Sequence, residues 1–169
     1  MNDAELRQCF SQIRRKDRKA FETLYADLKT PVFTVLLRIV QDKSEAEDLL
    51  QDFFLKLYQS PPGDEVARPR AYLFQSARNL ALDSLRKRRP ALTMDQYPPP
   101  ATEQDPAERL DLEQALQTLT DLERQIVTLH LNGGLTFRQT AQIVQAPLGS
   151  VLWRYRRALD KLRAQLTTD

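Results

Sequence analysis

The sequence predicts an all-α protein built from two small helical domains. Only four of its 169 residues are glycine, and almost no segment shows the alternation of β-branched and polar residues that marks a half-buried strand. Apolar residues instead recur at intervals of three and four, which is the spacing of a helix with one buried face. One proline-rich segment interrupts this pattern, so we expect the helices to form two groups.

The proline-rich segment lies between residues 90 and 106, where five prolines occur and three of them are consecutive, at 98–100. Consecutive prolines lack the N–H donors of a helix, so they predict an extended linker. We therefore expect a helical domain over residues 1–90, a linker over 91–105 and a second helical domain over 106–169. At about 3.1 Å per residue the linker spans roughly 50 Å, which lets both domains reach one DNA duplex.

Capping residues mark where the predicted helices begin, because their side chains accept hydrogen bonds from the free N–H groups of the first turn. Thr30 followed by Pro31 predicts a helix start within the first domain. A cap residue with Glu or Gln three positions later, the capping-box pattern, occurs at Ser44, Asp105, Thr120 and Thr136. With these starts we predict helices over residues 3–15, 18–28, 31–41, 44–59, 69–89, 106–118, 121–132, 137–144 and 150–166.

The predicted helix over residues 44–59 has a buried face and a contrasting acidic face. Its apolar stripe comprises Ala46, Leu49, Leu50, Phe53, Phe54, Leu57 and Tyr58. Residues 42–52 carry a net charge of −4, from five acids and one lysine, and Leu55 stands off the apolar stripe on the acidic side. An acidic rim around an apolar anchor suits a protein partner. A solvated helix face with one stray leucine fits the same pattern, so both interpretations stay open.

The next predicted helix, over residues 69–89, has the opposite charge. Residues 66–90 contain seven Lys or Arg and one Asp, a net charge of +6. Cations for phosphates, an amide for base edges and aromatic rings for stacking are the side chains of a nucleic-acid surface. A basic helix end with its aromatics in the core is the alternative, but four consecutive basic residues at 86–89 exceed what a helix end needs. The candidate nucleic-acid contacts are Arg70, Tyr72, Phe74, Arg78, Asn79, Arg86, Lys87 and Arg88.

Residues 132–166 predict a helix-turn-helix that reads DNA. A short helix over 137–144 precedes a turn in which Pro147 and Gly149 interrupt the helix, and Ser150 is a favoured cap for the second helix. That helix carries five Lys or Arg against one acid, and such a helix fits the major groove. An ordinary amphipathic helix with a solvated basic face is the alternative. The candidate DNA contacts are Thr136, Arg138, Ser150, Leu152, Trp153, Arg154, Arg156 and Arg157.

Several other classes of protein are disfavoured by the composition. The sequence has no apolar run of 18 residues and no signal-peptide pattern, so we expect a cytoplasmic protein without membrane insertion. Its single cysteine, Cys9, has no partner for an intrachain disulfide or a metal site. The single histidine, His130, has no accompanying Ser, Cys or metal partner, so we expect no catalysis, no cofactor and no metal. The net charge of +2 does not by itself indicate a nucleic-acid partner.

Several motifs in order give the chain a family resemblance. They are AFETLY (residues 20–25), EAEDLLQDFFLKLY (45–58), PRAYL (69–73), ARNLALD (77–83), LERQIV (122–127) and PLGSV (147–151). Together they cover nearly the whole chain, and the chain resembles the extracytoplasmic-function (ECF) sigma factors of bacterial RNA polymerase.

The resemblance implies a role for each surface. The face with Glu47, Asp48, Gln51, Asp52 and Leu55 binds the coiled coil of the largest polymerase subunits. The segment 60–89 recognises and opens the minus-ten element of the promoter, with the loop before Pro69 holding a flipped base. The helix-turn-helix reads the minus-thirty-five element, and an anti-sigma factor clamped on both domains commonly controls release.

The second helix of the helix-turn-helix departs from the family pattern. Family members usually have Lys or Arg and then Ser after the position of Val151, whereas this chain has Leu152 and Trp153. These side chains can pack on thymine methyl groups or on another protein. Two other functions therefore remain alternatives to a sigma factor. One is a stand-alone helix-turn-helix regulator whose first half dimerises or senses a signal, and the other is a sigma-like adaptor that reads DNA poorly.

Overall fold

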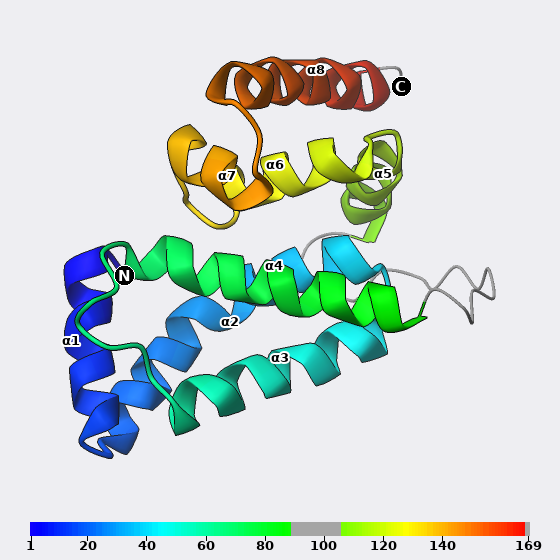
Figure 1. Ribbon diagram of the computed structural model, residues 1–169. Coiled ribbons are helices and arrows are strands. Elements are labelled where there is room, and N and C mark those ends of the chain that lie inside the picture. The colour runs from blue at the N-terminus through cyan, green and yellow to red at the C-terminus, as the bar shows by residue number, and fades with distance from the viewer. Residues whose placement is uncertain (89–105, 168–169) are drawn as a thin grey trace.

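The computed structural model describes residues 1–88 and 106–167, with side chains from residue 111 onward in the second range. The described residues contain helices and no strand, which confirms the all-α prediction (Figure 1). The helices are α1 (Asp3–Arg14), α2 (Arg18–Val40), α3 (Lys43–Gln59), α4 (Pro69–Arg88), α5 (Pro106–Gln117), α6 (Asp121–Leu131), α7 (Phe137–Val144) and α8 (Leu148–Leu166). The predicted linker and the predicted cap at Asp105 lie outside the described residues.

Helices α1–α4 form the first group, around a core of fully buried apolar side chains. Leu24, Leu36 and Phe74 are among its completely buried members, and edge-to-face aromatic pairs extend it, with the rings of Tyr25 and Phe54 4.7 Å apart. Burial of this kind is the main source of stability for such a group.

Helix α2 runs through Pro31 without a break, so the prediction of two helices, over 18–28 and 31–41, is wrong. Pro31 removes one backbone donor from the helix. However, Leu28, Val32 and Val35 all lie on one buried face of α2. The burial of this continuous face outweighs the lost hydrogen bond, and the apolar spacing across the proline was the better guide.

Two helix starts also differ from the sequence prediction. Helix α3 is capped by Asp42, whose side chain accepts from the Glu45 N–H at 3.1 Å, and not by Ser44. Helix α8 begins at Leu148 after Pro147, so Ser150 lies inside the first turn and is not the cap. The turn before α8 is made by Gln145, which ends α7 with a left-handed φ of 57°. The predicted caps at Thr120 and Thr136 are confirmed, the latter as a full capping box.

The second helical group is not separate from the first. Helix α6 buries one face in a small cluster with α5 and α8, made by Ala115, Leu116, Leu119, Val127, Ala158 and Leu162. Its opposite face contributes Ile126 and Leu129 to the hydrophobic cluster of α1–α4, together with Leu135, Ala141, Ile143 and Val144. Figure 1 shows α6 and α7 lying between α4 and α8. The two groups therefore share one core, with α2 and α4 on one side and α6 and α7 on the other.

Replacing Pro31 tests the cost of the proline inside α2. We expect Pro31→Ala to raise the free energy of unfolding by about 1–3 kcal/mol, because alanine restores the missing N–H and removes the ring clash. Denaturant unfolding followed by circular dichroism measures this change, with Thr30→Ala as the neighbouring control. A Pro31→Ala variant less stable than the parent would contradict the continuous helix.

Candidate protein-binding and nucleic-acid-binding surfaces

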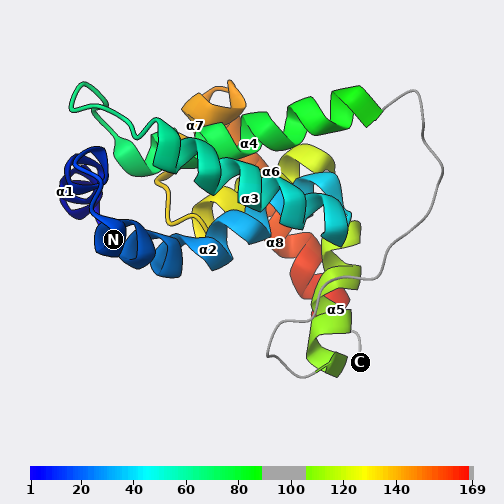
Figure 2. The same cartoon turned by 90° about the horizontal axis from the view of Figure 1, so that it is seen from below.

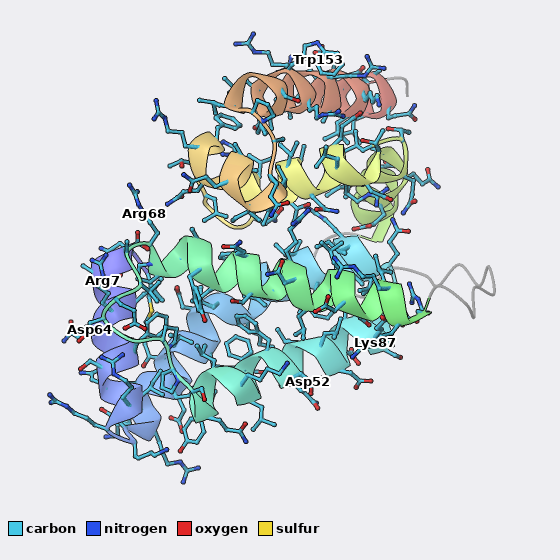
Figure 3. All side chains as sticks on the ribbon, in the orientation of Figure 1. Arg7, Asp52, Asp64, Arg68, Lys87 and Trp153 are labelled. Atoms are coloured by element: carbon cyan, nitrogen blue, oxygen red, sulfur yellow. The ribbon has the colours of Figure 1, made fainter. Side chains whose placement is uncertain are left out.

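The outer side of α3 presents the predicted protein-binding residues together. Glu47, Asp48, Gln51, Asp52 and Leu55 are all exposed, and Leu55 has 54% of its surface accessible although it is a large apolar residue. The opposite side of α3 is buried in the core. In Figure 2, which views the structure from below, α3 lies uncovered by the second group, and Figure 3 shows Asp52 pointing away from α6–α8. We call these five residues the acidic face of α3.

A cavity of about 550 Å³ opens between the C-terminal half of α3, the loop that follows it and α4. Two predicted nucleic-acid residues line this α3–α4 pocket: Tyr72, which is 44% exposed, and Asn79. Lys56 of α3 and Asp83 of α4 add opposite charges to the wall. The remaining lining residues are Phe53, Leu57, Gln59, Ser60, Pro62, Leu73, Ser76 and Leu80.

The loop between α3 and α4, residues 60–68, is held against α1 by two arginines. Arg14 donates to the Pro62 carbonyl and pairs with Asp64 at 2.8 Å, and Arg7 donates to the Ala67 carbonyl. Figure 3 labels Arg7 of α1 and Asp64 of the loop on the same side of the molecule. Backbone carbonyls held by guanidinium donors give the rim of the pocket a fixed shape.

Arg70 and Arg78 do not line the pocket, because their side chains lie toward the second group. Arg70 Nε donates to the Gly133 carbonyl at 2.6 Å. Arg78 Nε donates to Gln125 Oε1 at 2.7 Å and its Nη1 to the Ile143 carbonyl at 3.1 Å. Burial, with a smaller contribution from Arg86, lowers the pKa of Arg78. Both predicted DNA contacts are thus occupied within the chain.

Phe74 is a core residue, and the prediction that it stacks on nucleic acid needs correction. Its ring has 0% exposure, and the Arg70 guanidinium lies 5.3 Å from the ring centre. The helical position of Phe74, one turn from the buried Ala77, places it on the apolar stripe of α4. Of the two aromatics at the start of α4, only Tyr72 is exposed.

The basic C-terminal end of α4 serves two purposes. Arg86 and Lys87 are exposed, and Figure 3 labels Lys87 at this end of the helix. Arg88 instead ties α4 to the start of α3: it pairs with Glu45, lies 3.8 Å from Asp42 and donates to the Val40 carbonyl at 2.9 Å. The prediction of a DNA contact therefore suits Arg86 and Lys87, whereas Arg88 has a structural role here.

Helix α8 presents a basic and aromatic face on the far side of the second group. Trp153 is 57% exposed, and the Arg157 guanidinium lies 5.3 Å from its ring centre, a cation–π contact. Arg156 and Arg138 are also exposed, whereas Ser150, Leu152 and Arg154 are half-buried. Figure 3 shows Trp153 on the outer edge of α8, away from α1–α4. Thr136 is exposed, with its hydroxyl engaged in capping α7.

His130 and Cys9 are structural side chains. His130 stacks on Phe137 at 3.9 Å and its Nδ1 is 2.7 Å from the Leu135 carbonyl, so it braces the start of α7. Cys9 is buried, and burial raises the pKa of its thiol. Within residues 1–88 and 106–167, no group of three or more His, Cys, Asp or Glu side chains is arranged to bind a metal ion. No helix in those ranges is long and apolar enough to cross a membrane.

The structure adds one residue that the sequence patterns did not single out. Arg38 near the end of α2 donates to Asn132 Oδ1 at 2.7 Å and to Thr128 Oγ1 at 3.2 Å. It is a lone cation in an apolar helix segment. The position of a charged residue in an apolar segment was the signal that could have identified Arg38, because a charge on a largely buried helix needs a hydrogen-bonding partner.

Two family models match the chain. The model for sigma-70 region 2 matches residues 24–91, and the model for sigma-70 region 4 matches residues 115–164. The first match covers most of α2–α4 and the second covers α6–α8 with the end of α5.

Curated relatives resemble the chain over almost its full length. It is 29% identical to the ECF RNA polymerase sigma factor RpoE of Cereibacter sphaeroides, over 90% of this chain and 89% of that protein. It is 27% identical to the ECF sigma factor SigK of Mycolicibacterium vanbaalenii, over 95% and 88%, and 24% identical to SigW of Bacillus subtilis, over 95% and 96%.

Two solved structures share the fold. One is the sigma factor RpoE of Bartonella quintana in complex with the anti-sigma factor NepR, with a TM-score of 0.74, 21% identity, and coverage of 89% of this chain and 99% of that chain. The other is CnrH in complex with the cytosolic domain of CnrY, with a TM-score of 0.70, 23% identity, and coverage of 98% and 99%.

The different environments of Phe74 and Tyr72 give a direct test of the placement of α4. We expect Phe74→Ala to lower the free energy of unfolding by about 3–5 kcal/mol, because it leaves a cavity in the core. Tyr72→Ala on the exposed side should change it by roughly 1 kcal/mol or less. Denaturant titrations of both variants measure the difference, and equal losses would contradict the orientation of the helix.

Proposed function

Because this chain belongs to the ECF sigma factors, subunits that direct RNA polymerase to promoters, we propose that three of its surfaces divide that task. The acidic face of α3 docks on the polymerase core, the α3–α4 pocket takes up the minus-ten element, and α8 reads the minus-thirty-five element. The observation that carries this proposal is that an exposed acidic face on α3 and an exposed basic face on α8 lie on opposite sides of one chain. In this proposal the acidic face of α3 binds a protein and the basic face of α8 binds DNA.

The acidic face of α3 has the geometry of a helix that binds along another helix. Asp48, Asp52 and Leu55 recur at intervals of four and three residues, so they lie on one face. Leu55 supplies an apolar anchor and the acids supply a rim that selects a basic partner surface. The coiled coil of the largest polymerase subunits, the partner implied by the family resemblance, is the occupant that we assign.

The α3–α4 pocket has the side chains that a base removed from a DNA stack requires. Extruding a base costs a few kcal/mol, which stacking and hydrogen bonds must offset. Tyr72 offers an exposed ring for stacking, Asn79 an amide for a base edge and Lys56 a cation for a phosphate. The two arginines that hold the loop over 60–68 keep the pocket in shape before DNA arrives.

Helix α8 supplies the reading of the minus-thirty-five element. Arg156 is exposed and free to reach phosphates or base edges in the major groove. Trp153 and the half-buried Leu152 present apolar surface where the family has a charged residue and a hydroxyl. We therefore expect a preference for thymine, whose methyl group is the apolar feature of the groove. The contact between Trp153 and Arg157 restricts the arginine to one side of the helix.

The working partners follow from the same assignment. The chain acts without catalysis of its own, in the cytoplasm with polymerase and promoter DNA. One of the solved structures cited above holds a sigma factor together with an anti-sigma factor, and the other is a complex of CnrH with the cytosolic domain of CnrY. We propose that this chain also takes an anti-sigma partner.

Substitutions on α3 test the polymerase assignment. We expect the double variant Asp48→Ala/Leu55→Ala to weaken binding to core polymerase by about 2 kcal/mol or more, roughly thirtyfold in Kd, because it removes the anchor and part of its rim. Run-off transcription from genomic fragments and a polymerase pull-down measure the loss. The matched control is Glu22→Ala/Leu166→Ala, which removes an exposed acid and an exposed leucine elsewhere. Unchanged affinity of the α3 variant would remove this assignment, and a tight footprint without polymerase would favour a stand-alone regulator.

Arginine substitutions on α8 test the reading of DNA. We expect Arg156→Ala to cost about 1–3 kcal/mol in affinity for the upstream promoter element, as loss of a base-edge contact does. Arg163→Ala, two turns further along α8, is the control and should cost less. Footprinting of the polymerase–promoter complex measures both, and full upstream protection by the Arg156→Ala complex would contradict the assignment.

A further inference from the structure

A cavity of about 310 Å³ lies where α2, α4 and α6 meet. Its wall includes four arginines: Arg38 near the end of α2, Arg86 and Arg88 at the end of α4, and Arg124 in the first turn of α6. Figure 1 and Figure 2 both show the end of α2 close to α4 and α6. We call this the arginine cavity. It is distinct from the α3–α4 pocket, with which it shares no lining residue.

The wall of the arginine cavity has an excess of positive charge. Among the described residues that line it, Asp121 is the single acid against four arginines, and this exposed carboxylate pairs with Arg124 at 3.1 Å. Burial lowers the pKa of Arg38, Glu113 raises it, and the charge of Arg124 lowers it again. The guanidinium groups are thus close enough to disfavour one another's charge, and an anion between them would offset this repulsion.

Two of the four arginines have N–H groups to offer to a ligand. Arg38 uses only its Nη1 for Thr128 and Asn132, and Arg86 uses only its Nη1 for Asp83, at 3.0 Å. Among the residues that the structure describes, the Nε and Nη2 groups of both arginines have no acceptor. A guanidinium with two such groups matches the oxygens of a phosphate, which it binds through paired hydrogen bonds.

The other two arginines are held in place at the wall. Arg88 pairs with Glu45, and Arg124 donates to the carbonyls of Leu116 and Leu119 at 3.3 and 3.2 Å. Their charges therefore keep a fixed position beside the cavity, even though most of their donors are occupied. The arginine cavity combines two anchored cations with two that can bind, which is a preorganised site for an anion with more than one charge.

The rest of the wall suits the uncharged part of a ligand. Ile39, Leu82 and Leu85 supply apolar surface, as in most small-molecule sites, where a few polar groups fix the orientation. Gln125 accepts from Arg78 through its Oε1, and its NH2 group remains for an acceptor on a ring. A ligand with a planar base next to its phosphates matches this wall better than inorganic phosphate does.

We propose that the arginine cavity binds a nucleoside diphosphate, with its phosphates on Arg38 and Arg86 and its base on the apolar side chains of α2 and α4. This site is independent of the surfaces assigned to polymerase and promoter DNA. Because its wall comes from both helical groups, the ligand binds their packed arrangement and stabilises it by mass action. The concentration of a small phosphorylated metabolite thereby acts on the arrangement of this chain.

Calorimetric titration of the full chain with GDP, without polymerase or divalent cations, tests the proposal. We expect one GDP per chain, about tenfold weaker binding of inorganic pyrophosphate, which lacks the base, and no measurable binding of guanosine, which lacks the phosphates. At a GDP concentration of about 100 times Kd, the Tm should rise by roughly 5–10 °C.

Two substitutions with matched controls locate the site. Arg86→Gln removes a ligand-binding cation and should weaken GDP binding about tenfold, whereas Lys87→Gln removes the neighbouring exposed cation, outside the wall, and should weaken it less than about threefold. Gln125→Glu keeps the acceptor for Arg78 but adds a carboxylate to the wall, so we expect a loss of about tenfold or more. Gln114→Glu makes the same change on the exposed side of α5 and should have little effect.

Three results would overturn the proposal. One is the absence of saturable binding of both GDP and pyrophosphate to a chain with full helical content by circular dichroism. Another is an equal loss of affinity in each variant and its control, which would reflect net charge alone. The third is binding of a single-stranded DNA oligonucleotide where neither small anion binds, which would make the cavity part of a DNA surface. Each is measured without polymerase, so the proposed function is tested separately by run-off transcription.

Discussion

Three arginine side chains of α2 and α4 are held against the second helical group by neutral acceptors, and the arrangement of the whole molecule depends on this contact. Arg38, Arg70 and Arg78 bring α6 and α7 onto α4, so that Ile126 and Leu129 enter the core of the first group. These guanidinium groups are half-buried, and such a group is stable only while its donors are satisfied. The same contact therefore joins the two groups through hydrogen bonds from charged donors to neutral acceptors.

The candidate binding surfaces are distributed around this contact. The acidic face of α3 and the outer face of α8 lie on opposite sides and stay accessible, whereas the arginine side of α4 is covered. Helix α4 contributes to both features: Tyr72 and Asn79 line the α3–α4 pocket, and Arg70 and Arg78 contact the second group. Under the proposed function, the surface assigned to polymerase is accessible in this arrangement, whereas the covered side of α4 becomes accessible only after the groups part.

Local signals in the sequence predicted most of the elements and the exposed sites, because both depend on spacing along a helix. Residues a few positions apart predicted three features: the capping box at Thr136, the acidic face of α3 and the exposed side of α8 with Trp153. The apolar spacing also indicated the continuity of α2 through Pro31 and the burial of Phe74, but the predictions followed the proline and the aromatic residue type instead. The partners of Arg38 did not follow from local spacing, because Arg38 and Asn132 are 94 residues apart. Tertiary packing overrides local preference at such positions.

The distance between the two groups tests this account most directly. Spin labels at Thr23→Cys on α2 and Gln114→Cys on α5, both exposed sites, in a Cys9→Ala background, report that distance by pulsed electron resonance. The account predicts one narrow distance distribution in the free chain and a longer mean distance in the complex with core polymerase and promoter DNA. The same distribution in both states would show that the groups never separate, and would contradict it.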